Sequence, residues 1–215
     1  MKAVELTKYG SPKFLQIVEK EKPSLKDKEI LIKMHASSVS SGDARIRRAD
    51  PAIIRLIFGF KKPRKSVLGV VVSGEIVAVG KAVSKFKVGD QVFGDAGMNF
   101  GAHAEYLSLS EDAVLSKKLS NMTYEEAAAI PFGATAALHF LKIAKIQKNQ
   151  KVLIYGASGA IGTMAVQMAK NMGAQVTAVC STANLELVKS LGADKVIDYT
   201  QEDFTKNGES YDVIF

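Results

Sequence analysis

Residues 151–162 read KVLIYGASGAIG, and after Thr163 the chain continues MAVQMAKNMG. The apolar period changes there from strand-like to helical, which predicts a strand, a glycine turn and then a helix. Gly159 allows the backbone to approach a ligand, and Gly162 allows the helix to lie close to its strand. Free N–H groups and the helix dipole favour an anion at such a helix start, so we predict a dinucleotide diphosphate site. The predicted binding residues are Ser158, Gly159, Ala160, Ile161 and Gly162.

The surrounding sequence supports this interpretation. Residues 152–155 are β-branched, aliphatic and aromatic, and a second strand is expected at 175–180, after the helix stop at Gly173. A βα turn that binds no phosphate is the alternative. The stricter glycine fingerprint would place its first glycine at Ala157, where a tight turn tolerates alanine.

Composition indicates a globular protein. The 215 residues are 47% hydrophobic, which suffices for one large domain or two small ones. The single cysteine, Cys180, excludes a disulfide framework and suggests a reducing compartment. Residues 1–9 contain no secretory signal, and no segment reaches the roughly 18 apolar residues of a membrane span. We therefore expect a cytoplasmic protein with no membrane partner.

The positive charge does not predict a nucleic-acid partner. Lys and Arg number 29 against 22 acidic residues, but they are spread along the chain apart from a run at 61–65. No nucleic-acid motif with interleaved aromatic residues accompanies them. We interpret the run as a solvated loop, with steering of an anionic cofactor as an alternative role.

The chain divides into two predicted domains near residue 121. Residues 1–121 are expected to form a barrel-like β domain, with strands at 2–7, 15–18, 30–36, 67–79, 91–93 and 104–109. In residues 122–215 the period becomes helical, with Thr123 and Glu126 as a capping box. A second helix, interrupted by Pro131 and Gly133, continues to about Lys145. After it, strands alternate with helices, which predicts a parallel sheet.

Four strands are expected in this second domain, at 152–155, 175–180, 195–198 and 211–215. A complete doubly wound sheet has six. We therefore expect the chain to be an amino-terminal portion of a longer protein, or a truncated form of one. The Rossmann domain and its nicotinamide half would then be incomplete, and the first domain would lack a carboxy-terminal return.

The end of the second strand bears on the choice of cofactor. NAD sites place an acid about 20 residues beyond the glycines, where this chain has Cys180, Ser181 and Thr182. Without an acid there, a 2′-phosphate meets no repulsion, and the Ser181 and Thr182 hydroxyls can donate to it. Capping of the next helix is the alternative for one of them. Tyr199 closes over the adenosine in this interpretation, or is a plain sheet-edge tyrosine. We predict NADPH rather than NADH.

Further motifs extend over nearly the whole chain. They are LGVVVSGEIVAVG at 68–80, FKVGDQVFG at 86–94, GAHAEY at 101–106, EEAAAIPFGATA at 125–136, VLIYGASGAIGTMAVQMAK at 152–170 and LGADKVIDY at 191–199. With them the chain resembles the medium-chain dehydrogenase/reductase superfamily, in particular its zinc-independent quinone oxidoreductase-like branch. The resemblance implies an alcohol dehydrogenase-like α/β protein, in which a GroES-like β-barrel domain precedes a Rossmann doubly wound parallel sheet. It also implies a homodimer for the full-length protein.

In the zinc alcohol dehydrogenases of this superfamily, two cysteines and a histidine bind the catalytic metal. The matching residues here are Ser40, Val70 and Pro131, which supply neither thiolate nor imidazole. The resemblance therefore implies a site without zinc.

Ser40 and Thr135 match positions that face the nicotinamide in relatives, and they are the predicted catalytic residues. Thr135 on a helix could equally be a buried hydroxyl that bonds to its own backbone. Residues 40–43 read SSGD where relatives often have Asn-Pro-x-Asp, so the substrate pocket is expected to differ. We expect Asp43 to anchor its loop.

These features predict an NADPH-dependent oxidoreductase with a small-molecule substrate. Hydride would pass to a quinone or an α,β-unsaturated carbonyl compound, because no metal is present to polarise an isolated carbonyl. An NADPH-binding regulatory protein with little or no catalysis is the alternative. A stable but inactive fragment is a third possibility.

Overall fold

The computed structural model describes all 215 residues, which form two compact units. Unit 1 is Met1–Pro131 and unit 2 is Phe132–Phe215. The division follows Pro131 rather than residue 121, because helix α3 (Tyr124–Ala129) packs on strands of unit 1.

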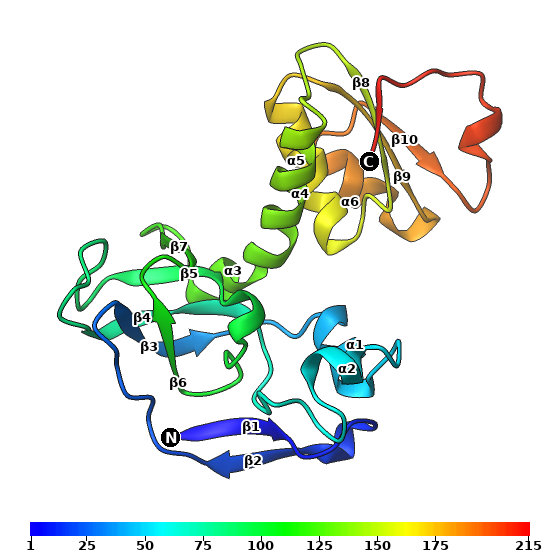
Figure 1. Ribbon diagram of the computed structural model, residues 1–215. Helices are drawn as coiled ribbons and strands as arrows, with labels where there is room; N and C mark the ends of the chain where they lie inside the picture. The colour runs from blue at the N-terminus through cyan, green and yellow to red at the C-terminus, as the bar shows by residue number, and fades with distance from the viewer. The chain divides into compact units, whose positions relative to one another are not determined.

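Unit 1 is built mainly from antiparallel strands (Figure 1). Five of them form one sheet in the order β6-β3-β4-β5-β7, and β1 pairs with β2 separately. Their bounds are β1 Lys2–Leu6, β2 Leu15–Glu19, β3 Glu29–Ala36, β4 Val71–Val79, β5 Gln91–Asp95, β6 Tyr106–Ser110 and β7 Val114–Lys117. Alternation along β3 and β5 buries Ile30, Ile32 and Val92 completely, and these side chains form the core of the sheet.

Two short helices in unit 1 were not expected from the sequence. They are α1 (Ser41–Arg48) and α2 (Ile54–Phe58), and 3₁₀ turns lie at η1 (Pro12–Phe14) and η2 (Gly97–Asn99). Helix α1 carries only two apolar residues, Ala44 and Ile46, too few to predict an apolar helix face from the sequence. It is defined instead by its ends, with a capping box at Ser40 and a left-handed C-cap at Ala49. Strand β7 was also missed.

Unit 2 contains a parallel sheet in the strand order β10-β9-β8-β11. Its elements are α4 Pro131–Ile143, β8 Lys151–Tyr155, α5 Ala160–Asn171, β9 Gln175–Cys180, η3 Thr182–Asn184, α6 Leu185–Ser190, β10 Lys195–Asp198, η4 Phe204–Lys206 and β11 Val213–Ile214. The first three strands lie beside one another in chain order, and the fourth pairs on the opposite side of β8. The predicted fold class, a β domain followed by a parallel α/β sheet, is confirmed.

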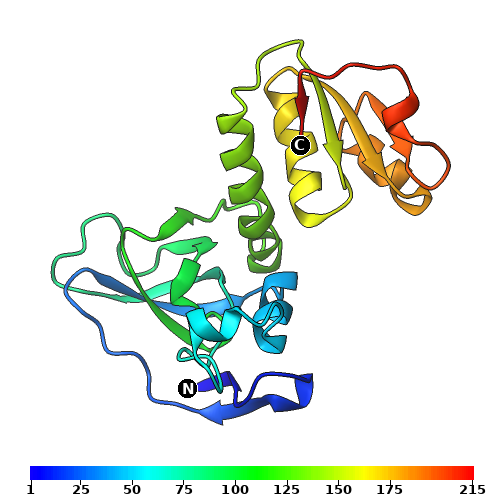
Figure 2. The same cartoon turned by 45° about the vertical axis from the view of Figure 1, so that its right-hand side comes forward.

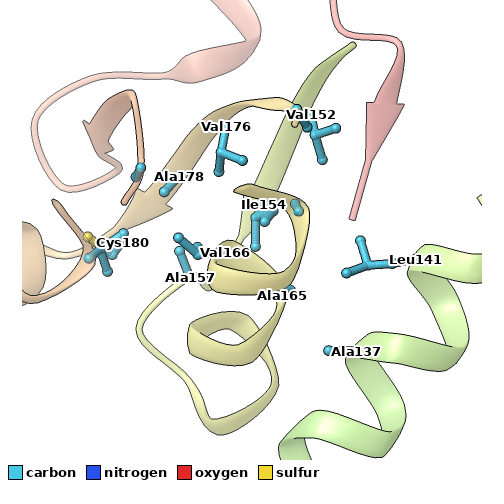
Figure 3. Close-up of a cluster of buried hydrophobic side chains, with 14 residues drawn as sticks. Ala137, Leu141, Val152, Ile154, Ala157, Ala165, Val166, Val176, Ala178 and Cys180 are labelled. Carbon is cyan, nitrogen blue, oxygen red and sulfur yellow. The ribbon is translucent and has the colours of Figure 1, made fainter. Parts of the chain in front are cut away.

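The two faces of this sheet carry different cores. Ile154 and Ala178 face helices α4, α5 and α6 in a large apolar cluster that also contains Ala137 and Leu141 of α4 (Figure 3). The other face carries a smaller cluster around Leu153. Helices α4 and α5 lie side by side in Figures 1 and 2.

The prediction that Gly133 interrupts a helix is wrong. Pro131 begins α4, where a missing N–H costs nothing, and Gly133 lies inside the helix. A Cβ added at Gly133 would lie 2.1 Å from the carbonyl oxygen of Ala160. Glycine therefore permits the close approach of α4 to the start of α5. No helix combines the length and apolar character needed to cross a bilayer.

Candidate functional site

The turn from β8 to α5 is formed almost entirely by backbone. Val152, Leu153 and Ile154 are fully buried, so β8 is fixed firmly in the sheet. Gly156 leaves the strand with a φ of +72°, a conformation that side chains disfavour. Gly159 is the N-cap of α5, and Ser158 lies half-buried in the turn before it.

Gly162 holds the first turn of α5 against this loop. A Cβ at position 162 would lie 2.3 Å from the carbonyl oxygen of Gly156 and 2.7 Å from the Cα of Ala157. Real side chains do not make such contacts, so any larger residue would push α5 away from β8. With Gly133 on its other side, the start of α5 is held between two backbone segments.

The first amides of α5 have no acceptor within the helix. The amide of Thr163 donates to the Gly159 carbonyl at 2.9 Å, whereas those of Ala160, Ile161 and Gly162 have no preceding helical carbonyl to reach. Gly159 offers no capping side chain, and no acid lies in the first turn. Gly159 and Ala160 are exposed. Partial positive charge therefore faces solvent here, and a diphosphate fits this turn.

The ends of β9 and β10 bring three polar residues together. The Thr182 hydroxyl donates to the carboxylate of Asp198, which also accepts from the amide and hydroxyl of Thr200 at 2.9 and 2.7 Å. The hydrogen bond from Thr182 holds the pKa of Asp198 below its ordinary value, although burial opposes this. Asp198 was not predicted as a site residue, although an acid at the end of a strand in this fold was a usable signal.

The prediction that Ser181 or Thr182 caps the following helix is wrong. Ser181 occupies the N-cap position of η3, but its side chain makes no capping bond and instead accepts from Asn184 at 3.1 Å. The Thr182 hydroxyl is engaged by Asp198, a stronger acceptor because it is charged. Helix α6 begins at Leu185, and its N-cap residue, Asn184, makes no side-chain capping bond.

Two tyrosines lie close together in unit 2. Tyr199 follows β10 and is 53% exposed, and its ring centroid lies 6.4 Å from that of Tyr155. Tyr155 ends β8 and was not predicted as a site residue. Exposed aromatic rings at the carboxyl edge of a parallel sheet provide a surface on which a base can stack.

Ser40 and Asp43 form a tight capping box at the start of α1. The amide and hydroxyl of Ser40 both donate to Asp43 at 2.8 Å, and the Asp43 amide donates back to the Ser40 hydroxyl at 3.2 Å. The other carboxylate oxygen of Asp43 accepts from the amide of Gly69 at 3.2 Å. Asp43 is thus buried in a helix, not part of a loop as expected. With its proton directed at Asp43, Ser40 offers a free lone pair rather than a donor.

Thr135 is an exposed residue of α4, so the burial expected in the alternative for its hydroxyl is not found.

Comparisons with known proteins agree with this architecture. The family model "Alcohol dehydrogenase GroES-like domain" matches residues 26–119, and "Zinc-binding dehydrogenase" matches residues 160–215. A quinone oxidoreductase structure from Coxiella burnetii superposes with a TM-score of 0.89 at 32% identity, covering 100% of this chain and 68% of that one. This chain belongs to the medium-chain dehydrogenase/reductase superfamily, in its quinone oxidoreductase-like branch.

Two curated relatives of this dehydrogenase/reductase chain are a reductase and an oxidoreductase from plants. It is 34% identical to the 2-methylene-furan-3-one reductase of Solanum lycopersicum and 32% identical to the chloroplastic NADPH-dependent alkenal/one oxidoreductase of Arabidopsis thaliana. Both matches cover 100% of this chain and 56% of the relative. The chain therefore spans about half the length of these relatives.

The three residues of this dehydrogenase/reductase chain that are predicted to match the zinc ligands of relatives do not fit a metal ion. Ser40 binds Asp43, Val70 has an alkyl side chain, and Pro131 has no donor atom in its ring. No group of three or more histidine, cysteine, aspartate or glutamate residues is placed to hold a metal. A tetrahedral catalytic zinc needs three protein donors that these positions do not supply.

Proposed function

We propose that this chain is part of a zinc-independent, NADPH-dependent oxidoreductase that reduces quinones or α,β-unsaturated carbonyl compounds. The observation that carries the proposal is the open first turn of α5, seated at the end of the first strand of a sheet with Rossmann order. Family membership supports it, because the relatives named above are reductases and oxidoreductases.

On this proposal, unit 2 binds the cofactor. The amides of Ala160, Ile161 and Gly162 hold the diphosphate, and Gly159 allows its oxygens to approach the backbone. Ser158 borders the same turn. Ser181, Thr182 and Tyr199 line the sheet edge where the adenosine end would lie.

NADPH is proposed as the coenzyme for two reasons. No acid occupies the residues directly after β9, and the Arabidopsis thaliana relative is named as NADPH-dependent. The bound nicotinamide supplies the hydride, so the protein has to position it and exclude water.

The proposed substrate class follows from the lack of metal-ligating side chains at three positions. Without a metal ligand set at Ser40, Val70 and Pro131, no Lewis acid polarises the acceptor oxygen. A conjugated acceptor needs less polarisation, because the charge that develops spreads over its π system. Ser40 and Thr135 are the proposed residues near the reacting centre. The Ser40 hydroxyl donates its hydrogen bond to Asp43. We therefore propose that Ser40 accepts a hydrogen bond from the substrate or the cofactor and orients it, and that another group donates the proton that the reduced substrate takes up.

The test uses the whole protein that contains this chain, with a panel of quinones and enones and with NADPH or NADH. We expect oxidation of NADPH with at least one acceptor. Turnover with none of them would contradict the proposal. Tight NADPH binding without oxidation would instead support the regulatory alternative, and failure to bind either coenzyme would exclude both.

The location, oligomeric state and partners of the protein are also proposed. We propose a cytoplasmic homodimer that acts on a small molecule and binds neither nucleic acid nor membrane. The buried free thiol of Cys180 is compatible with a reducing compartment. Cell fractionation and sedimentation of the whole protein test these points, and an organellar or monomeric protein would contradict them.

A further inference from the structure

No acid follows β9 directly in the sequence, but Asp198 brings one to the same edge of the sheet from β10. It is the last residue of β10 and is paired in register with Cys180, the last residue of β9. Its carboxylate therefore reaches the residues that follow β9, at the edge where the adenosine ribose would lie. The residue is nevertheless only 9% exposed, so it is largely withdrawn from water.

The hydroxyl groups of Thr182 and Thr200 both donate hydrogen bonds to the Asp198 carboxylate. One oxygen accepts from the Thr182 hydroxyl, and the other accepts from the Thr200 hydroxyl at 2.7 Å. The two hydroxyl oxygens lie 3.0 Å apart. Since a hydroxyl has a single proton, neither threonine is left with a donor to offer a ligand.

The Asp198 carboxylate keeps its negative charge at neutral pH. The Thr182 hydrogen bond holds the pKa of Asp198 below its ordinary value, and burial, with a further contribution from the negative charge of Asp198, raises the pKa of the Cys180 thiol. A phosphate needs donors or cations, whereas a ribose diol needs acceptors. Asp198 with its two threonines provides acceptors and a negative charge, which favours a diol.

We propose that Asp198 is a specificity-determining residue that limits the preference for NADPH over NADH. This inference rests on the proposed function. Asp198 acts through its charge, which opposes a 2′-phosphate, and through Thr182, whose proton it withholds. In NAD sites, an acid at the end of the second strand of the sheet accepts a hydrogen bond from the ribose. Asp198 would supply this acid from the neighbouring strand, β10.

The test is Asp198→Asn in the whole protein, with the dissociation constants of NADPH and NADH measured by nucleotide fluorescence. An asparagine amide can donate to Thr182, which frees the threonine proton for a phosphate. We expect NADPH affinity to rise relative to NADH affinity by about tenfold, as loss of a nearby unit charge implies. A structural defect would weaken both nucleotides alike, so the ratio separates the two effects.

The matched control is Asp194→Asn, which removes the same charge just before β10, where Asp194 binds Lys170. The ratio of NADPH affinity to NADH affinity in this variant should stay within about twofold of the wild-type ratio. The charge of Asp194 lies at the other end of β10, so it is distant from the proposed ribose position and is screened by salt. A rise equal to that of Asp198→Asn would overturn the proposal, because net charge alone would then explain it.

Thr182→Val supplies a second test that keeps the Asp198 charge. Because the Thr182 proton is already committed, its loss should change the affinity ratio by less than about threefold. A selective loss of NADPH affinity above about tenfold would show that Thr182 donates to the phosphate, and would overturn the proposal. An unchanged ratio in a folded Asp198→Asn protein would do the same. If the wild-type protein binds neither nucleotide, the proposed function itself fails.

Discussion

Helix α5 in unit 2 and helix α1 in unit 1 begin in opposite ways. The first turn of α1 is closed by side chains, because Ser40 and Asp43 bond to each other and to the backbone. Helix α3 begins similarly, with Thr123 and Glu126. Helix α5 begins at Gly159 with no side-chain cap and no acid in its first turn.

This difference separates structural helix starts from a binding helix start. A capping box satisfies the free amides within the protein and stabilises the helix by about 1 kcal/mol. The amides of α5 lack that stabilisation and remain available to an anion. Glycines at 159 and 162 in the turn, and Gly133 in the neighbouring α4, carry no side chains, so the turn is shaped mostly by backbone.

The largest effect is expected from Gly162→Ala. Its methyl group would lie 2.3 Å from the Gly156 carbonyl oxygen, so α5 must move. We expect the free energy of unfolding of unit 2 to fall by about 3 kcal/mol, with loss of dinucleotide binding. Gly159→Ala is the matched control, since its Cβ would lie 3.3 Å from the same oxygen, and it should cost less than about 1 kcal/mol. Equal stabilities in urea denaturation would refute the close-packing argument.

Gly159→Asp converts the open start of α5 into a capped one. The backbone at Gly159, with φ −77° and ψ 169°, suits an N-cap aspartate. We expect the free energy of unfolding to rise by about 0.5–1 kcal/mol from the cap. NADPH binding should weaken by roughly 30-fold, since the carboxylate occupies the amides and repels the diphosphate.

Gly159→Ser serves as its control, because serine caps without charge and should weaken binding less. Calorimetric titration and thermal denaturation measure both quantities. An aspartate variant that binds NADPH as well as the wild-type protein would show that the diphosphate is not held at this turn.

Ser40→Ala and Thr123→Ala remove equivalent hydroxyl groups from two capping boxes. Each should lower the free energy of unfolding by about 1 kcal/mol, because one amide loses its acceptor. Only Ser40→Ala should also lower kcat/KM, since Ser40 is proposed to lie near the reacting centre. Denaturation and steady-state kinetics of the two variants make the comparison, and equal activities would remove Ser40 from the proposed site.

The smallest effect concerns pH. Burial would raise the pKa of Asp194, but hydrogen bonds from Lys170 and the Val176 amide outweigh it and hold the pKa below the ordinary value. A depressed native pKa stabilises the fold above the unfolded pKa of about 3.9, and this contribution disappears as pH falls through the native pKa. Asp194→Asn should therefore flatten the loss of stability in acid. An acid-unfolding profile parallel to that of the wild-type protein would contradict this.

The sequence predicted the features that depend on local pattern. The strands of unit 2, the Thr123–Glu126 capping box and the change from β to α/β structure were all expected from period and spacing, and the structure contains them. Helix α1 was missed because only two of its eight residues are apolar, although the Ser40 and Asp43 spacing was a signal for it. The site residues remain predictions whose positions are now known.

Sequence by itself determined which segments bury apolar side chains, and therefore the order of strands and helices and the glycines that lie between them. Only the tertiary structure decided which polar groups meet. Asp198 lies 16 residues beyond Thr182 in the chain, yet parallel pairing of β9 and β10 brings its carboxylate to that hydroxyl. Gly133 reaches Ala160 only through the packing of α4 on α5. Such contacts depend on strand register and helix packing, which no local pattern of residues specifies.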